Sequence, residues 1–166
     1  MPEMNMAPEV ADPKTFATLP GKTMYRTVNA QGGETALDIC GRTLSSDVTT
    51  VGAGRMGDGF YFHINKTASQ AYGSHSNNLQ KTATMAIKLN KNAKVVSENS
   101  LRNMLNKEKP SVQKAVHAMR SGGNWDGYSG YCAYALRKGY NVVSDGAIYN
   151  IIDRRAATWS GQVVPK

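Results

Sequence analysis

Short apolar segments that switch between strand and helix periods constrain the fold of this chain more than any other feature. Alternation with a period of two predicts strands at 22–28, 60–62, 82–89, 94–96, 140–144, 147–153 and 156–159. Apolar residues three and four apart predict helices at 34–44, 67–72, 98–107 with Ser97 as N-cap, 131–138, and after an N-cap at Ser111. Strands at both ends with helices between them favour an α+β fold over a doubly wound parallel sheet.

The length and composition indicate one domain. The chain has 166 residues, of which 40% are hydrophobic, enough to bury a single core. Residues 1–20 hold four of the six prolines and show no apolar periodicity. We therefore expect a flexible leader over 1–20 and a single domain over 21–166.

The sequence lacks several patterns that mark particular classes of protein. No apolar run approaches the roughly 20 residues of a membrane-spanning helix. The N-terminus lacks a secretory signal pattern, so we expect a cytoplasmic protein, or one delivered into a target cell by another route. Cys40 and Cys132 show no Cys-x-x-Cys spacing, and whether they pair stays open. The three histidines also lack ligand spacing, so no metal is expected.

The charge is concentrated in the second part of the chain. Residues 1–62 hold five basic and seven acidic residues, whereas residues 63–166 hold fifteen basic and five acidic ones, a net charge of +10. Such a segment favours a polyanionic partner, although a merely solvated basic surface is the alternative.

A glycine-rich segment, GAGRMGDGF over 52–60, precedes an aromatic strand. Dinucleotide-binding and P-loop glycines follow a strand and open a helix, so this segment is neither of those motifs. The alternative is a flexible turn. Directly after Gly59 comes Phe60-Tyr61-Phe62, and eleven residues after Tyr61 comes Tyr72, within TASQAYG.

This order of glycines and tyrosines resembles the nicotinamide-binding core of the ADP-ribosyltransferase superfamily, in its diphtheria-toxin and poly(ADP-ribose)-polymerase branch. The resemblance implies that Tyr61 on a strand and Tyr72 on the next helix sandwich the nicotinamide of NAD. Stacking and cation–π attraction suit an electron-poor pyridinium between two aromatic faces. The alternative is that both tyrosines are core aromatics.

The first strand, Met24-Tyr25-Arg26-Thr27, is similar to the Y-R-G form of the arginine-bearing members of that superfamily. The resemblance implies that Arg26 anchors the NAD phosphates or ribose, as a planar cation can. It also places Thr27 where a backbone group pairs with the nicotinamide amide, and Gly59 where the loop backbone comes close to NAD. A surface arginine on an edge strand is the alternative for Arg26.

Near the C-terminus, Asp145-Gly146-Ala147-Ile148-Tyr149 resembles the acid-x-x-x-Tyr pattern that carries the family's catalytic acid. Asp145 stands where most members have Glu, and Gly146 would let the shorter acid approach the ribose. The alternative is a turn residue, since Ser-Asp-Gly is a good turn sequence. Members that modify arginine carry a second acid or amide two residues earlier, where this chain has Val143.

Taken together, the resemblance implies an ADP-ribosyltransferase-like α+β fold, with two small antiparallel or mixed sheets and flanking helices. It implies a bacterial or phage toxin or effector that transfers ADP-ribose from NAD to a macromolecule, either a nucleic acid such as RNA or a protein, without a metal or a membrane. The catalytic residues would be Asp145 and Arg26, and a toxin would have an immunity or antitoxin partner. An NAD glycohydrolase, or an inactive module that binds NAD or nucleic acid, is the alternative function.

Overall fold

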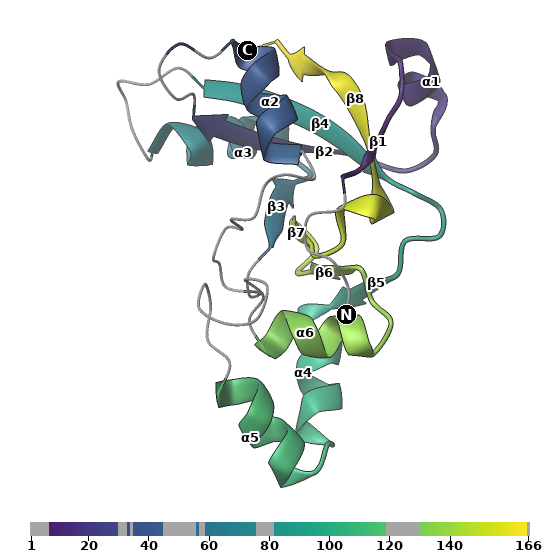
Figure 1. The fold of residues 1–166 in the computed structure, drawn as a ribbon, viewed down its shortest axis with the longest axis vertical. Coiled ribbons are helices and arrows are strands. Elements are labelled where there is room, and N and C mark those ends of the chain that lie inside the picture. The colour runs from purple at the N-terminus through teal and green to yellow at the C-terminus, as the bar shows by residue number, and fades with distance from the viewer. Residues whose placement is uncertain are drawn as a thin grey trace.

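One mixed sheet of eight strands runs through the computed structural model, which describes residues 7–29, 33, 35–44, 56, 59–75, 82–118 and 130–165 (Figure 1). Its strands, in spatial order, are β1 (Glu9–Val10), β8 (Ala157–Val164), β4 (Thr82–Leu89), β2 (Thr23–Asn29), β3 (Phe60–His63), β7 (Ile148–Ile151), β6 (Val142–Ser144) and β5 (Val95–Ser97). The helices are α1 (Pro13–Thr18), α2 (Ala36–Leu44), α3 (Lys66–His75), α4 (Glu98–Asn106), α5 (Pro110–Ala118) and α6 (Gly130–Arg137), with a 3-10 turn at Arg154–Ala156. The α+β class is confirmed.

The two halves of this sheet meet at a single pair of residues. β2 and β4 pair over seven positions, but β2 and β3 pair only at Tyr25 and His63. We expected two small sheets, and the structure has one continuous sheet with a narrow junction, because this one pair keeps the halves joined. The β1–β8 and β5–β6 pairs are parallel, and the other pairs are antiparallel.

Two apolar cores lie on opposite faces of the sheet. α2 covers the first core, where its Ile39 and Cys40 pack with Met85 and Val142 among others. α4 and α6 cover the second core, which includes Val143. Successive strand residues point to opposite faces, so Val142 and Val143 show that each core belongs to a different face.

The strand at 82–89 and the helix after Ser97 agree with the sequence prediction. Ser97 caps α4 by accepting a hydrogen bond from the Ser100 amide at 3.1 Å. The predicted N-cap at Ser111 is wrong, because α5 already begins at Pro110. Proline suits the first turn of a helix, where its missing N–H would have no helical partner.

The described part of the expected leader is packed on the sheet. β1 pairs with β8, and α1 follows with Asp12 as its N-cap. The ammonium group of buried Lys88, on β4, donates to the carbonyls of Phe16 and Leu19 at 3.0 and 2.9 Å. Residues 9–18 therefore belong to the fold, which differs from the prediction of a leader separate from the domain.

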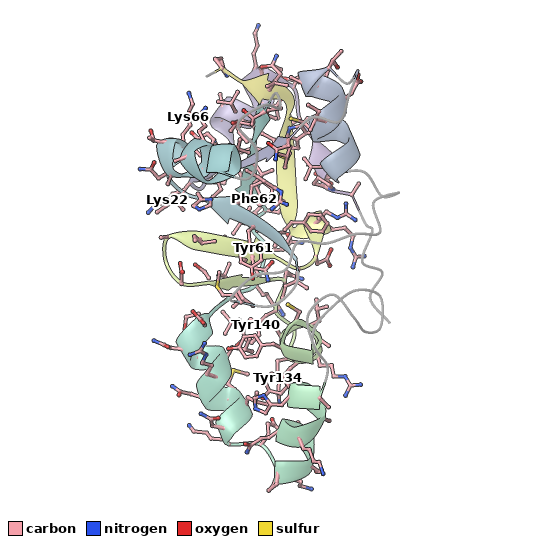
Figure 2. The ribbon with its side chains drawn as sticks, turned by 90° about the vertical axis from the view of Figure 1, so that its left-hand side faces the viewer. Lys22, Tyr61, Phe62, Lys66, Tyr134 and Tyr140 are labelled. Atoms are coloured by element: carbon pink, nitrogen blue, oxygen red, sulfur yellow. The ribbon has the colours of Figure 1, made fainter. Side chains whose placement is uncertain are left out.

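None of the helices in the described ranges has both the length and the apolar character needed to cross a membrane. α4, α5 and α6 form a lobe at one end of the molecule, whereas α1, α2 and α3 lie toward the other (Figures 1 and 2).

Candidate functional site

The residues singled out by the resemblance gather where the two halves of the sheet meet. Arg26 lies on β2, Tyr61 lies on the neighbouring β3, and Asp145 lies at the start of the turn that leads into β7, the next strand across. The Arg26 guanidinium donates from Nη1 to the Tyr61 carbonyl at 3.1 Å. Arg26 thus bridges β2 and β3 beside their single backbone pair. We call this junction, with Arg26, Tyr61, His63 and Asp145, the seam.

Two arginines flank one aromatic ring at the seam. The guanidinium carbon of Arg26 lies 6.0 Å from the centroid of the Phe60 ring, and that of Arg154 lies 4.5 Å from it. Arg154 is 1% exposed, and Arg26 is half-buried. Cation–π contact and the bond to Tyr61 hold Arg26 in place. A positioned guanidinium is the property that phosphate binding requires.

Tyr61 is fixed at both its backbone and its hydroxyl. Its hydroxyl accepts a hydrogen bond from the Met56 amide at 2.9 Å, and its ring packs against the second core (Figure 2). Tyr72 falls within α3, and its side chain lies outside what the structure describes. For the predicted stacking pair, the structure therefore gives only the elements, β3 for Tyr61 and α3 for Tyr72.

α3 packs on the face of the sheet to which Tyr61 points. The Thr27 hydroxyl lies 3.0 Å from that of Ser69 on α3 and 2.8 Å from that of Thr84 on β4. Thr27 shares a face with Tyr25, which pairs with His63, and Tyr61 lies two residues from His63. Tyr61 and α3 therefore share one face. The Thr27 side chain joins α3 to the sheet, a structural role beside the backbone role that the resemblance implies.

A close contact within the fold explains why residue 59 is a glycine. A Cβ atom at Gly59 would overlap the Asn150 side chain, with Asn150 Cγ only 2.8 Å away. Asn150 is fully buried, and its amide donates to the Met56 carbonyl at 3.3 Å. Close approach to Asn150 therefore accounts for glycine here without any ligand.

Asp145 opens the turn between β6 and β7. Its Oδ1 accepts hydrogen bonds from the amides of Ala147 and Ile148 at 2.9 and 2.8 Å, and Gly146 has a φ of +99°. The turn geometry that Ser-Asp-Gly predicts is thus present. The Asp145 side chain is exposed, so a turn residue and a group that faces a ligand are compatible roles.

The charges of Arg26 and Asp145 both shift the pKa of His63. Burial lowers the pKa of half-buried His63, the positive charge of Arg26 lowers it further, and the negative charge of Asp145 opposes them. Arg26 and Asp145 therefore act on the same imidazole. The place of His63 on β3, between β2 and β7, could not be predicted from the local sequence.

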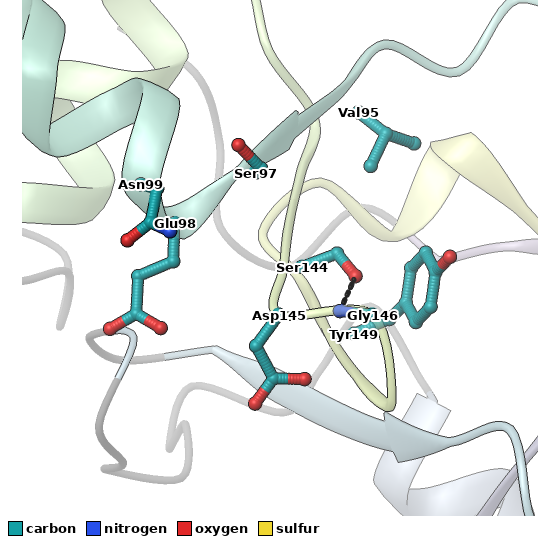
Figure 3. A pocket seen from close by; sticks show the side chains of 8 residues that line it. All are labelled: Val95, Ser97, Glu98, Asn99, Ser144, Asp145, Gly146 and Tyr149. Atoms are coloured by element: carbon teal, nitrogen blue, oxygen red, sulfur yellow. Dashed lines mark hydrogen bonds between the residues drawn. The ribbon is translucent and has the colours of Figure 1, made fainter.

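A pocket of about 550 Å³ lies beside Asp145 (Figure 3). It is lined by Val95, Ser97, Glu98, Asn99, Ser144, Asp145, Gly146 and Tyr149. β5 and β6 run parallel with Ser97 opposite Ser144, so the residues that follow them, Glu98 and Asp145, come side by side. Figure 3 shows both carboxylates pointing to the same side of the pocket.

No local pattern in the sequence marks Glu98 as a site residue. Glu98 is 7% exposed, and Arg102 donates to it at 2.8 Å. In the sequence it is only an acidic residue in the first turn of a helix, where acids are common. Its nearness to Asp145 depends on the parallel pairing of β5 with β6, which no local pattern reveals.

The described ranges contain no group of three or more His, Cys, Asp or Glu side chains that could hold a metal ion. Comparison of the chain with protein-family models, curated proteins and solved structures found no match.

Proposed function

We propose that this protein is an NAD-dependent mono-ADP-ribosyltransferase of the toxin or effector type. The placement of Arg26 on β2, Tyr61 on the neighbouring β3 and Asp145 in the turn that leads into β7, the next strand across, carries the proposal. These residues lie 35 or more positions apart in the sequence, and the resemblance predicts that they act together.

In the proposed reaction the bond between nicotinamide and C1′ of the ribose breaks, and nicotinamide leaves with the bonding electron pair. A nucleophile on the acceptor forms the new bond to C1′ and gives its proton to solvent. Asp145 stabilises the positive charge that develops on the ribose. Arg26 binds the NAD phosphates, and Tyr61 and Tyr72 stack on the nicotinamide.

The second carboxylate supports this chemistry. Glu98 adds negative charge to the pocket that Asp145 lines, and that charge favours an oxocarbenium-like transition state. Arg102 partly neutralises Glu98, so we assign the larger effect to Asp145.

The test is nicotinamide release from NAD, measured with the protein alone and with duplex RNA, duplex DNA or a protein lysate. Release that needs one of these acceptors identifies a transferase and its acceptor class. Release without any acceptor identifies an NAD glycohydrolase instead. If no arm releases nicotinamide, the proposal of an NAD-cleaving enzyme is wrong.

Asp145→Ala, compared with Asp12→Ala, separates catalysis from folding in this assay. Both aspartates accept hydrogen bonds from nearby backbone amides, and Asp12 does so at the N-terminus of α1, on another element. We expect Asp145→Ala to reduce release at least 100-fold, a loss typical of one electrostatic catalytic group. Asp12→Ala should leave release unchanged.

A further inference from the structure

The helical lobe, residues 98–118 and 130–138, carries a large share of the excess positive charge of the described chain. It holds six basic and two acidic residues, a net charge of +4. At the other end of the sheet, residues 7–29 and 157–165 hold three basic and two acidic residues, a net charge of +1. Lys88, on β4, is buried against α1. The lobe is therefore more positive than the ranges at the other end of the sheet.

Three lysines of the lobe lie beside Glu108, either in space or in the sequence, and Arg137 is next to one of them. Lys138 lies 2.8 Å from the Glu108 carboxylate, which also accepts a hydrogen bond from the Tyr134 hydroxyl at 3.1 Å. Glu108 stands in the turn between α4 and α5 with a lysine on each side, and Arg137 precedes Lys138 at the end of α6. We call this set the basic corner; it consists of Lys107, Lys109, Arg137 and Lys138.

Glu108 does not neutralise the corner, because Lys138 already occupies it. Lys107, Lys109 and Arg137 are exposed and form no ion pair with the residues that the structure describes. Cations at helix C-termini stabilise the helix dipole, which accounts for Lys107 on α4 and Arg137 on α6. Lys109 instead precedes the N-terminus of α5, where a positive charge is unfavourable. Stability alone therefore does not explain the set.

Near the basic corner, the residues that the structure describes offer charge but no exposed aromatic ring. Within the described part of the lobe, Tyr134 is buried and Tyr131 is half-buried, as is Tyr140 just after it (Figure 2). Proteins that bind single strands stack bases on accessible aromatic side chains, whereas duplex backbones are bound through Lys and Arg. We infer that the basic corner binds the phosphate backbone of a nucleic-acid duplex. Only the further step, that this duplex is the ADP-ribose acceptor, rests on the proposed function.

The test is fluorescence anisotropy of labelled duplex RNA and duplex DNA with the full chain, without NAD. Contacts from Lys107, Lys109 and Arg137 give an expected log–log salt slope of about −2.7, so the affinity falls ~40-fold between 50 and 200 mM salt. Each of Lys107→Gln, Lys109→Gln and Arg137→Gln should reduce the slope by about 0.9. Comparison of the two duplexes tells whether the corner binds the backbone of RNA, of DNA or of both.

A matched triple variant, Lys14→Gln/Lys22→Gln/Lys66→Gln, removes the same charge from the other end of the molecule. It should keep the slope and affinity of the unchanged chain, and the triple variant of the corner should lose binding at 200 mM salt. The inference is overturned if both triple variants bind alike, if polyglutamate binds as tightly as the duplexes, or if single strands bind more tightly. The binding assay contains no NAD, so its outcome does not depend on the proposed function. If the separate assay with NAD shows no nicotinamide release, the proposed function is refuted and the binding result stands.

Discussion

Replacing Gly59 with alanine tests whether the backbone at the seam is shaped by Asn150 rather than by a ligand. The added Cβ would overlap the Asn150 side chain, which is fully buried and cannot turn away into solvent. Overpacking of this kind costs about 1–3 kcal/mol, and losing the hydrogen bond from Asn150 to the Met56 carbonyl costs about 1 kcal/mol more. We therefore expect the free energy of unfolding to fall by about 2–4 kcal/mol.

The assay is urea unfolding of Gly59→Ala, Asn150→Ala and the double variant. Because Asn150→Ala removes the atoms that clash, the double variant should be more stable than the sum of the single effects by about 1–3 kcal/mol. Gly41→Ala is the control, since a Cβ at this helical position of α2 meets nothing within 4 Å and should stabilise the protein by about 0.5–1 kcal/mol. A Gly59→Ala variant as stable as the unchanged chain, or strictly additive effects, would refute this reasoning.

Three further predictions concern stability and reactivity. Lys88→Met removes the ammonium that holds the carbonyls at the end of α1, so we expect a loss of about 2–3 kcal/mol in urea unfolding and faster tryptic cleavage at Lys14. The pKa of His63 lies below 6.5 in the folded chain, so the unfolded chain binds protons more readily and stability falls as the pH drops below 6.5; His63→Gln should flatten that fall between pH 7.5 and 5.5. Burial raises the pKa of Cys40 to about 11, and the Cys132 thiol is also buried, so neither thiol should react with a thiol reagent at pH 8 until the protein unfolds.

Local patterns were sufficient to predict most of the elements. The alternation over 82–89 locates β4 because one face of that strand meets the first core and the pattern has the period of a strand. Ser97 marks the start of α4 because a side-chain oxygen there satisfies a helical amide. These signals involve residues a few positions apart, which a sequence displays directly.

Contacts between distant segments could not be predicted in the same way. The expected leader is held by Lys88, about 70 residues away, and nothing in the prolines of 1–20 indicates that contact. Glu98 joins Asp145 only through the pairing of β5 with β6, and the basic corner arises because α6 ends beside the α4–α5 turn. By contrast, Arg26, Tyr61 and Asp145 could be proposed from the sequence because the resemblance itself groups them.

The central claim is that Asp145 stabilises the positive charge that develops on the ribose of NAD while the bond between C1′ of the ribose and the nicotinamide nitrogen breaks. Asp145→Asn tests it most directly, because asparagine can keep the side-chain oxygen that accepts from Ala147 and Ile148 while the negative charge is lost. The measurement is the rate of nicotinamide release from NAD by the two proteins at equal folded concentration. We predict release by the unchanged chain and a loss of at least 100-fold in Asp145→Asn, with an unchanged unfolding midpoint. Equal rates for the two proteins would contradict the claim.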